Sequence, residues 1–321
     1  MKVFVTRVIP QVGVDKMQEA GITVTQWTEK RDLTQEELIM HCKQNDALLS
    51  VGPNKLDATF LQQVQHLKVI ALLSVGYDII DIEAAAKYGI PVGNTPGVLS
   101  EATADIAFLL MLATARKAFY QHKKIAAGNW GFYEPTANLG IELYGKTLGI
   151  FGLGNIGFEL AKRCIGAYNM KIIYCNRTAN AEAETAFNAV KVTMDELLQQ
   201  SDVLSVHSAL TPQTKGLFNK NAFSKMKATS IFINTARGAI HNELDLIEAL
   251  QAGTIWGAGL DVTNPEPMHP DNILLTMPNV SVLPHIGSAT TETRNAMAIL
   301  SADNIIAGLN NKPLPCPVIH K

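Results

Sequence analysis

The chain has 321 residues, a length that suits two domains better than one hydrophobic core. Hydrophobic residues make up 47% and charged residues 17% of the sequence, which excludes a disordered chain. The 27 Lys and Arg against 29 Asp and Glu give a formal net charge of -2 without a basic stripe. We therefore expect neither nucleic acid nor a membrane as a partner.

Two further features bear on the compartment. The start "MKVFVTRVIP" enters a β-like run directly, without the pattern of a signal peptide, and the apolar stretch 106–115 is about half the ~20 residues of a membrane span. The cysteines are scattered, without a CxxC pair or histidines at ligand spacing, which predicts neither a disulfide framework nor a metal site. These are Cys42, Cys164, Cys175 and Cys316. We expect a cytoplasmic protein.

Short β-branched or apolar runs alternate with helical patterns along the chain. The runs cover residues 2–6, 46–50, 67–73, 147–152, 171–175, 202–207, 230–235, 256–262 and 280–285. Such alternation predicts parallel sheets covered by helices. The predicted fold is α/β, with two Rossmann-like or flavodoxin-like domains, parallel sheets and a cleft between the domains.

Glycine and proline residues that interrupt the strand and helix patterns indicate the domain boundaries. "GNTPGVLS" precedes one predicted helix over residues 100–128, with Ser100 as its cap and Gly128 as its stop. A last helix from about 290 to 309 leads the chain back to the first domain. We predict a discontinuous first domain, 1–97 plus 288–321, and a second domain, 98–287.

The glycine cluster "GLGNIG" lies between a predicted strand and a predicted helix, followed by another strand. Gly152 permits the tight turn, Gly154 lets the backbone approach a pyrophosphate, and Gly157 permits close helix packing. The helix start at Asn155 and Ile156 supplies amide donors. The pattern predicts a dinucleotide site in the second domain. The alternative is a glycine-rich turn without a ligand.

The next strand ends in "CNRT", where an NAD site usually has an acidic residue for the ribose hydroxyls. Asn176, Arg177 and Thr178 offer polar contacts instead, and an arginine pairs well with a phosphate. This favours NADP(H) as the cofactor, with NAD(H) as the other possibility. Arg177 as a solvated surface arginine is the alternative interpretation.

Four polar residues follow later strands, and the carboxyl ends of parallel strands gather ligand groups. They are Arg237, Asp261, Glu266 and His285. Each alone has an ordinary structural interpretation. In this order, with "SVGYDIIDIEAAAKYGIPVGNTPG", "GLGNIG", "TPQTKGLFN", "NTARG", "DVTNPEP" and "PHIGSAT", the chain resembles the D-isomer-specific 2-hydroxyacid dehydrogenase family almost throughout. Within it, the chain is most similar to the glyoxylate/hydroxypyruvate and 2-ketogluconate reductases.

The resemblance implies roles for these residues. Arg237 binds the carboxylate and the carbonyl oxygen of a 2-oxo acid, and His285 donates a proton to that oxygen as the nicotinamide delivers hydride. Glu266 hydrogen-bonds the imidazole and favours its charged form. Asp261 matches the position that holds the nicotinamide carboxamide, and Thr235 of "NTARG" is a further cofactor-binding candidate.

The resemblance also implies that the first domain binds substrate. Val75 and Gly76 match a loop whose amides grip the substrate carboxylate, although "GYD" also suits a simple turn. Thr103 matches a position near the nicotinamide, with a helix-surface threonine as the alternative. His207 is followed by "SALTP", where the family commonly has a proline before the leucine, and we assign it no catalytic role.

The segment "GNWGFYEP" resembles one that in related reductases contributes an aromatic side chain to the partner's cleft. Trp130 and Tyr133 as plain dimer-core residues are the alternative, and either interpretation predicts a homodimer. The leading functional prediction is an NADPH-preferring reductase of small 2-oxo acids to D-2-hydroxy acids. The alternatives are an NAD-dependent enzyme of the phosphoglycerate, lactate or formate type, and a dinucleotide-sensing corepressor.

Overall fold

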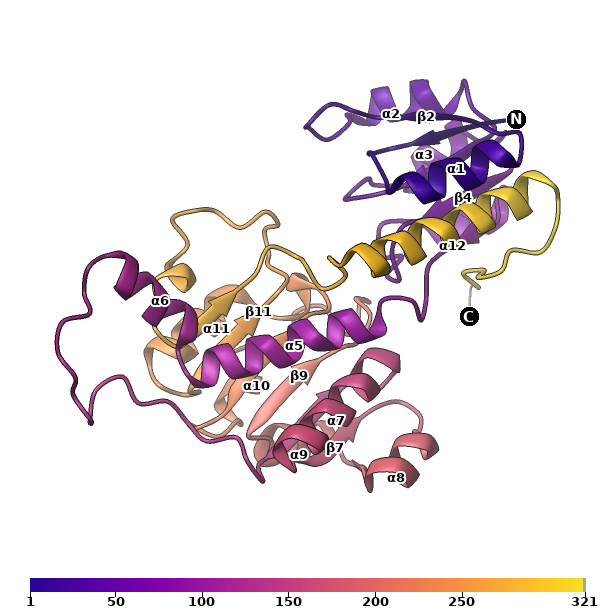
Figure 1. The fold of residues 1–321 in the computed structure, drawn as a ribbon. Coiled ribbons are helices and arrows are strands. Elements are labelled where there is room, and N and C mark those ends of the chain that lie inside the picture. The colour runs from indigo at the N-terminus through magenta and orange to yellow at the C-terminus, as the bar shows by residue number, and fades with distance from the viewer. Residues whose placement is uncertain (320–321) are drawn as a thin grey trace. The chain divides into compact units, whose positions relative to one another are not determined.

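The computed structural model describes residues 1–319, and the chain divides into two compact units (Figure 1). One unit comprises Met1–Leu99 with Ser288–Lys321, and the other comprises Ser100–Gly287. The boundaries predicted from the sequence lay at 97/98 and 287/288. Each unit contains one parallel sheet with helices, so the predicted α/β class is confirmed.

The first unit has a five-stranded sheet in the order β2-β1-β3-β4-β5, in which every strand pair is parallel. Its strands are β1 (Lys2–Val5), β2 (Thr23–Gln26), β3 (Ala47–Ser50), β4 (Val69–Leu72) and β5 (Val92–Gly93). Its helices are α1 (Gln11–Glu19), α2 (Gln35–Cys42), α3 (Ala58–Gln63), α4 (Ile82–Lys87) and α12 (Thr291–Leu309). The strands β3 and β4 are buried along their whole length, as expected of central strands.

Helix α12 ties the end of the chain into the first unit, where it runs beside α1 and over β4 (Figure 1). Thr290 caps it, which confirms the predicted last helix. Its buried Asn304 donates to the carbonyl of Asn94 at 3.0 Å and accepts from the amide of Cys316 at 3.1 Å. One side chain thus satisfies backbone groups from two distant segments, so the helix is fixed in place.

The second unit has a seven-stranded parallel sheet in the order β12-β11-β10-β9-β6-β7-β8. Its strands are β6 (Thr147–Phe151), β7 (Lys171–Cys175), β8 (Val190–Lys191), β9 (Val203–Val206), β10 (Ile231–Asn234), β11 (Gly257–Leu260) and β12 (Val280–Val282). Its helices are α5 (Ser100–Ala115), α6 (Ala118–Ala126), α7 (Asn155–Tyr168), α8 (Ala181–Phe187), α9 (Met194–Gln200), α10 (Lys220–Ser224) and α11 (Glu243–Gln251), with the short 3-10 turns η1 (Gly238–Ile240) and η2 (Ile273–Leu275). The strand order reverses between β6 and β9, where open sheets of this kind bind ligands.

The single helix predicted over residues 100–128 is wrong, because the structure forms α5 and α6 with a break between them. Lys117 adopts φ 54°, and the amide of Ile141 donates to the carbonyl of Ala115, which closes the end of α5. Ser100 is the first residue of α5 rather than its cap. Gly128, at φ 75°, does follow the end of α6 as predicted.

All nine predicted strand runs overlap strands of the structure, but three short strands were missed. These are β2, β5 and β8, of which the last two have two residues each. All three lie at sheet edges. The two-residue strands β5 and β8 are too short to show a pattern, and β2 has the mostly polar sequence TVTQ, which lacks an apolar run.

Candidate active site

The glycine turn between β6 and α7 has the geometry that a dinucleotide requires. Gly152 adopts φ 92°, and a Cβ there would lie 2.7 Å from the amide nitrogen of Ser208. A Cβ on Gly154 would meet nothing within 4 Å, whereas one on Gly157 would press on Ile150 at 3.0 Å. No side chain caps the start of α7, so its first amides have no side-chain acceptor. This turn fits a pyrophosphate.

Two asparagines hold the turn in shape. Asn176 accepts from the amide of Leu153 at 2.7 Å and donates to its carbonyl at 3.0 Å. Asn180 donates to the same carbonyl at 3.0 Å and caps α8. The Asn176 amide is therefore engaged with the turn itself, and we did not anticipate Asn180. Its position before a helix start was the only available signal.

Arg177 and Thr178 lie beyond the end of β7, and both are exposed. Neither side chain has a hydrogen bond to any other residue that the structure describes. The segment 176–178 contains no acidic residue. This end of the sheet therefore presents a cation and a hydroxyl to solvent.

His207 follows β9 and lies next to the glycine turn. Its Nε2 is 2.8 Å from the hydroxyl of Ser205, and its Nδ1 is 3.3 Å from the hydroxyl of Thr235. Burial lowers the pKa of His207 to about 4, so the ring is neutral at physiological pH. The neighbouring Ser208 hydroxyl is buried and has no hydrogen-bond partner among residues 1–319. An unsatisfied polar atom at this position also fits a bound cofactor.

A hydrogen-bonded turn after β10 presents Arg237. The buried Asn234 donates to the carbonyl of Arg237 at 2.9 Å and accepts from the amide of Ala236 at 3.0 Å. The Nδ2 atom of Asn234 also lies 3.1 Å from Nδ1 of His241, a buried ring whose pKa burial lowers to about 4. Sequence reasoning assigned no role to Asn234 or His241, because only the folded turn brings them together.

His285 and Glu266 form the central hydrogen-bonded pair of the site. Nδ1 of His285 lies 2.6 Å from a carboxylate oxygen of Glu266, and both side chains remain partly exposed, at 47% and 42%. Burial raises the pKa of Glu266, but the hydrogen bond and charge of His285, with the charge of Arg237, hold it below its usual range. The carboxylate is therefore ionised at neutral pH.

Asp261 fixes the segment that carries His285. Its two carboxylate oxygens accept from the amides of Ile286 and Gly287, both at 2.8 Å. The amide of His285 donates to the Asp261 carbonyl at 2.9 Å, and His285 itself adopts φ 54°. A positive φ in a histidine is uncommon and persists only where surrounding bonds enforce it. Burial raises the pKa of Asp261.

Thr103 of α5 is 5% exposed, so the alternative of a surface threonine is wrong. A Cβ on Gly287 would lie 3.3 Å from the Thr103 methyl and 3.1 Å from the Asp261 carboxylate. The structure therefore places Thr103 beside Asp261 and the histidine segment.

In the first unit, Val75 and Gly76 follow β4. The Val75 carbonyl accepts from Asn94 at 2.8 Å, and the Gly76 carbonyl accepts from the Ser74 hydroxyl at 2.7 Å. Neither amide has an acceptor among residues 1–319. Both amides are thus available to an anionic ligand.

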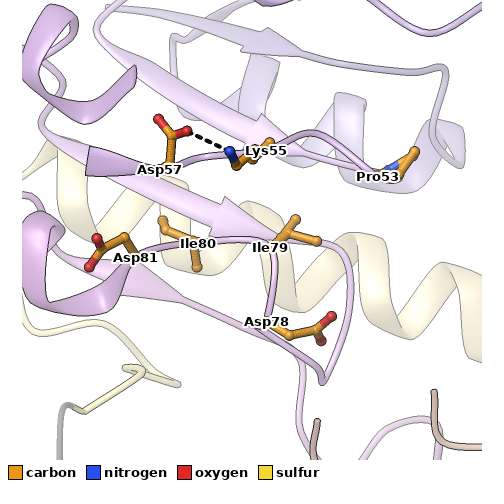
Figure 2. A pocket seen from close by; sticks show the side chains of 7 residues that line it. All are labelled: Pro53, Lys55, Asp57, Asp78, Ile79, Ile80 and Asp81. Atoms are coloured by element: carbon orange, nitrogen blue, oxygen red, sulfur yellow. Dashed lines mark ion pairs between the residues drawn. The ribbon is translucent and has the colours of Figure 1, made fainter. Parts of the chain in front are cut away.

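Figure 2 shows a cavity of the first unit that adjoins this loop, with Lys55 paired to Asp57 at 3.1 Å. Asp57 caps α3 by accepting from Phe60, and Asp81 caps α4 by accepting from Ala84. Two of the three acidic residues in the lining therefore cap helices. Among residues 1–319, no cluster of His, Cys, Asp and Glu has the arrangement of a metal site.

These features define an α/β protein with a dinucleotide turn and a histidine–glutamate pair at the carboxyl ends of the strands of one parallel sheet. The family model of the "D-isomer specific 2-hydroxyacid dehydrogenase, NAD binding domain" matches residues 108–287. The chain belongs to the D-isomer-specific 2-hydroxyacid dehydrogenase family, and it is an NAD(P)-dependent oxidoreductase.

Three relatives illustrate the similarity. A glyoxylate reductase of Thermococcus litoralis is 44% identical over 95% of this chain and 93% of its own. A human glyoxylate reductase/hydroxypyruvate reductase is 41% identical over 98% and 97%. The crystal structure of an NADPH-dependent glyoxylate/hydroxypyruvate reductase from Sinorhizobium meliloti, in complex with NADP and malonate, matches with TM-score 0.86 and 32% identity over 99% and 96%. No helix among residues 1–319 is both long and apolar enough to span a membrane.

Proposed function

We propose that this protein is an NADPH-preferring reductase of small 2-oxo acids, such as glyoxylate, hydroxypyruvate or a keto-sugar acid, which forms D-2-hydroxy acids. The observation that carries the proposal is the 2.6 Å contact between His285 and Glu266, with the charge of Arg237 acting on the same carboxylate. An imidazole paired with a carboxylate and partly exposed is a suitable proton donor. The names of the relatives support the substrate class.

Each residue has a defined task in the proposed reaction. The guanidinium of Arg237 binds the substrate carboxylate and polarises the carbonyl, while the amides of Val75 and Gly76 bind carboxylate oxygens. His285 donates its proton to the carbonyl oxygen, and Glu266 stabilises the charged imidazole beforehand. The nicotinamide, when bound, supplies the hydride.

The cofactor is held by the glycine turn, the uncapped start of α7 and residues near the histidine segment. We assign Gly152, Gly154, Asn155, Ile156 and Gly157 to the pyrophosphate. Thr103, Thr235 and Asp261 are assigned to the nicotinamide end, and Asn176 acts by holding Leu153. The exposed Arg177 and Thr178, without an acid beside them, support a preference for NADPH.

A homodimer in the cytoplasm is part of the same proposal. The segment after α6 exposes three aromatic side chains, Trp130 at 77%, Phe132 at 85% and Tyr133 at 80%. Aromatic groups exposed together commonly mark a protein interface. The four cysteines are free thiols, which suits a reducing compartment.

The test compares initial rates with glyoxylate and hydroxypyruvate at matched NADPH and NADH concentrations. We expect faster turnover with NADPH, and His285→Ala should lower kcat by about 10²- to 10⁴-fold. His269→Ala is the matched control, because His269 is an exposed histidine whose partner is Asp271 and not Glu266. Absence of turnover with every 2-oxo acid would contradict the proposed activity.

A further inference from the structure

A second cation lies beside Arg177, and it comes from the edge strand that the sequence did not reveal. Lys191 ends β8, where it pairs in register with Tyr174 of β7. Its Nζ donates to the carbonyl oxygen of Arg177 at 3.3 Å. The ammonium group therefore lies at the carboxyl end of β7, over the residues that follow that strand.

The charges around this point are unbalanced. Arg177 and Lys191 are both exposed, and neither forms an ion pair with any carboxylate of residues 1–319. Two acids follow in the first turn of α8. Glu182 forms no ion pair among residues 1–319, and Glu184 is bound to the hydroxyl of Tyr174. Two cations thus share one edge of the sheet without a protein anion between them.

We propose that Lys191 is a cofactor-specificity residue, which binds the 2′-phosphate of NADPH together with Arg177. The inference rests on the proposed function, and it deepens that function by assigning the phosphate a second ligand. A ribose phosphate carries a charge of roughly -1.5 to -2 near neutral pH, which two cations match better than one. Arg177 alone would leave part of that charge unpaired.

Lys191 and Arg177 offer different hydrogen-bond donors to a phosphate. The ammonium group has three donors, and the contact with the Arg177 carbonyl uses one of them. That contact restrains the flexible lysine side chain near Arg177 while two donors stay available for phosphate oxygens. The planar guanidinium of Arg177 can bind two oxygens at once.

The experiment uses Lys191→Gln, with Lys171→Gln as the matched control. Lys171 is an exposed lysine at the opposite end of β7, away from the carboxyl end of the sheet. Dissociation constants for 2′,5′-ADP and 5′-AMP are measured by isothermal titration calorimetry at low and high salt, together with KM for NADPH and NADH. The two nucleotides differ only in the 2′-phosphate.

In Lys191→Gln we expect the dissociation constant of 2′,5′-ADP and the KM of NADPH to rise about 10-fold. The values for 5′-AMP and NADH should change less than about twofold, and high salt should shrink the difference, since exposed charges are screened. Lys191→Arg should retain most of the discrimination. Lys171→Gln should match the wild type.

Two outcomes overturn the inference in distinguishable ways. If the wild type discriminates between the nucleotides and Lys191→Gln does so equally, Lys191 has no part in phosphate binding, while the proposed function stands. If the wild type binds both nucleotides equally, the NADPH preference itself fails and the role of Lys191 fails with it. Reductase activity with NADH would then still support the 2-oxo acid chemistry.

Discussion

The second unit's sheet has a fixed side, formed by β10, β11 and β12, and an exposed side, formed by β7 and β8. The residues that follow the strands are held differently on the two sides. After β10, β11 and β12, backbone and side chains are held by short hydrogen bonds, as between Asn234 and Arg237 or Asp261 and Gly287. After β7 and β8, Arg177 and Lys191 share one 3.3 Å contact and are otherwise exposed. Proton transfer demands a fixed geometry, whereas attraction of a phosphate acts over several ångströms and tolerates mobile side chains.

The largest expected effect is a loss of activity from a substitution on the fixed side of the sheet. Arg237→Gln should lower kcat/KM for glyoxylate or hydroxypyruvate about 10³-fold, because an uncharged amide neither holds the carboxylate nor polarises the carbonyl as strongly. Steady-state kinetics at saturating NADPH measures the loss, and KM for NADPH should change little. The exposed Arg116, at the end of α5, provides the control Arg116→Gln. A variant with normal kcat/KM would remove Arg237 from the substrate site.

A smaller effect, on cofactor binding, is expected from a substitution on the exposed side of the sheet. Arg177→Ala should raise KM for NADPH about 30-fold and leave KM for NADH nearly unchanged, because a charge-assisted hydrogen bond to the phosphate is lost. Turnover at saturation should persist, since no catalytic geometry depends on this side chain. Equal losses with the two cofactors would mean that Arg177 acts through the fold and not through the phosphate.

The smallest effect concerns the free energy of unfolding and its dependence on pH through His241, which contacts Asn234 in the turn that presents Arg237. Burial lowers the pKa of His241 from 6.5 to about 4, so the unfolded chain binds more protons than the folded one between these values. The free energy of unfolding therefore falls as pH drops from 6.5 towards 4. Replacing His241 with Phe should reduce the loss between pH 7 and pH 5 by about 1 to 2 kcal/mol.

Urea unfolding of both proteins at the two pH values measures this difference. Phe is the chosen replacement because the ring of His241 packs edge-on against Phe232, with centroids 5.7 Å apart. His207, whose pKa is also lowered to about 4, keeps its contribution in both proteins. Parallel pH profiles of the wild type and the variant would contradict a neutral, buried His241.

Several elements of the site were visible in the sequence because they depend on local rules. The glycine turn needed only three glycines between a strand and a helix, and Gly152 indeed adopts φ 92°. Glu266 and His285 were recognised from motifs that follow strands, and the structure joins them at 2.6 Å. Their roles in catalysis remain predictions for the experiments above.

Other features depended on segments meeting across the sheet. The Asn176 amide was expected to face the cofactor, yet both of its polar atoms bind Leu153. These hydrogen bonds form because the turn after β6 lies beside the end of β7. No local sequence pattern predicts that proximity. The same holds for Lys191, since β8 has two residues and is defined only by its pairing with β7.

By itself the sequence determined most of the strands, the last helix, the dinucleotide turn and the family, because periodicity, glycine spacing and motif order are properties of neighbouring residues. Only the tertiary structure decided how α5 ends, which side chains hold the segments of Arg237 and His285, and which cations gather after β7. Those outcomes arise from contacts between residues far apart in the chain, where hydrogen-bond satisfaction and burial select one arrangement among many.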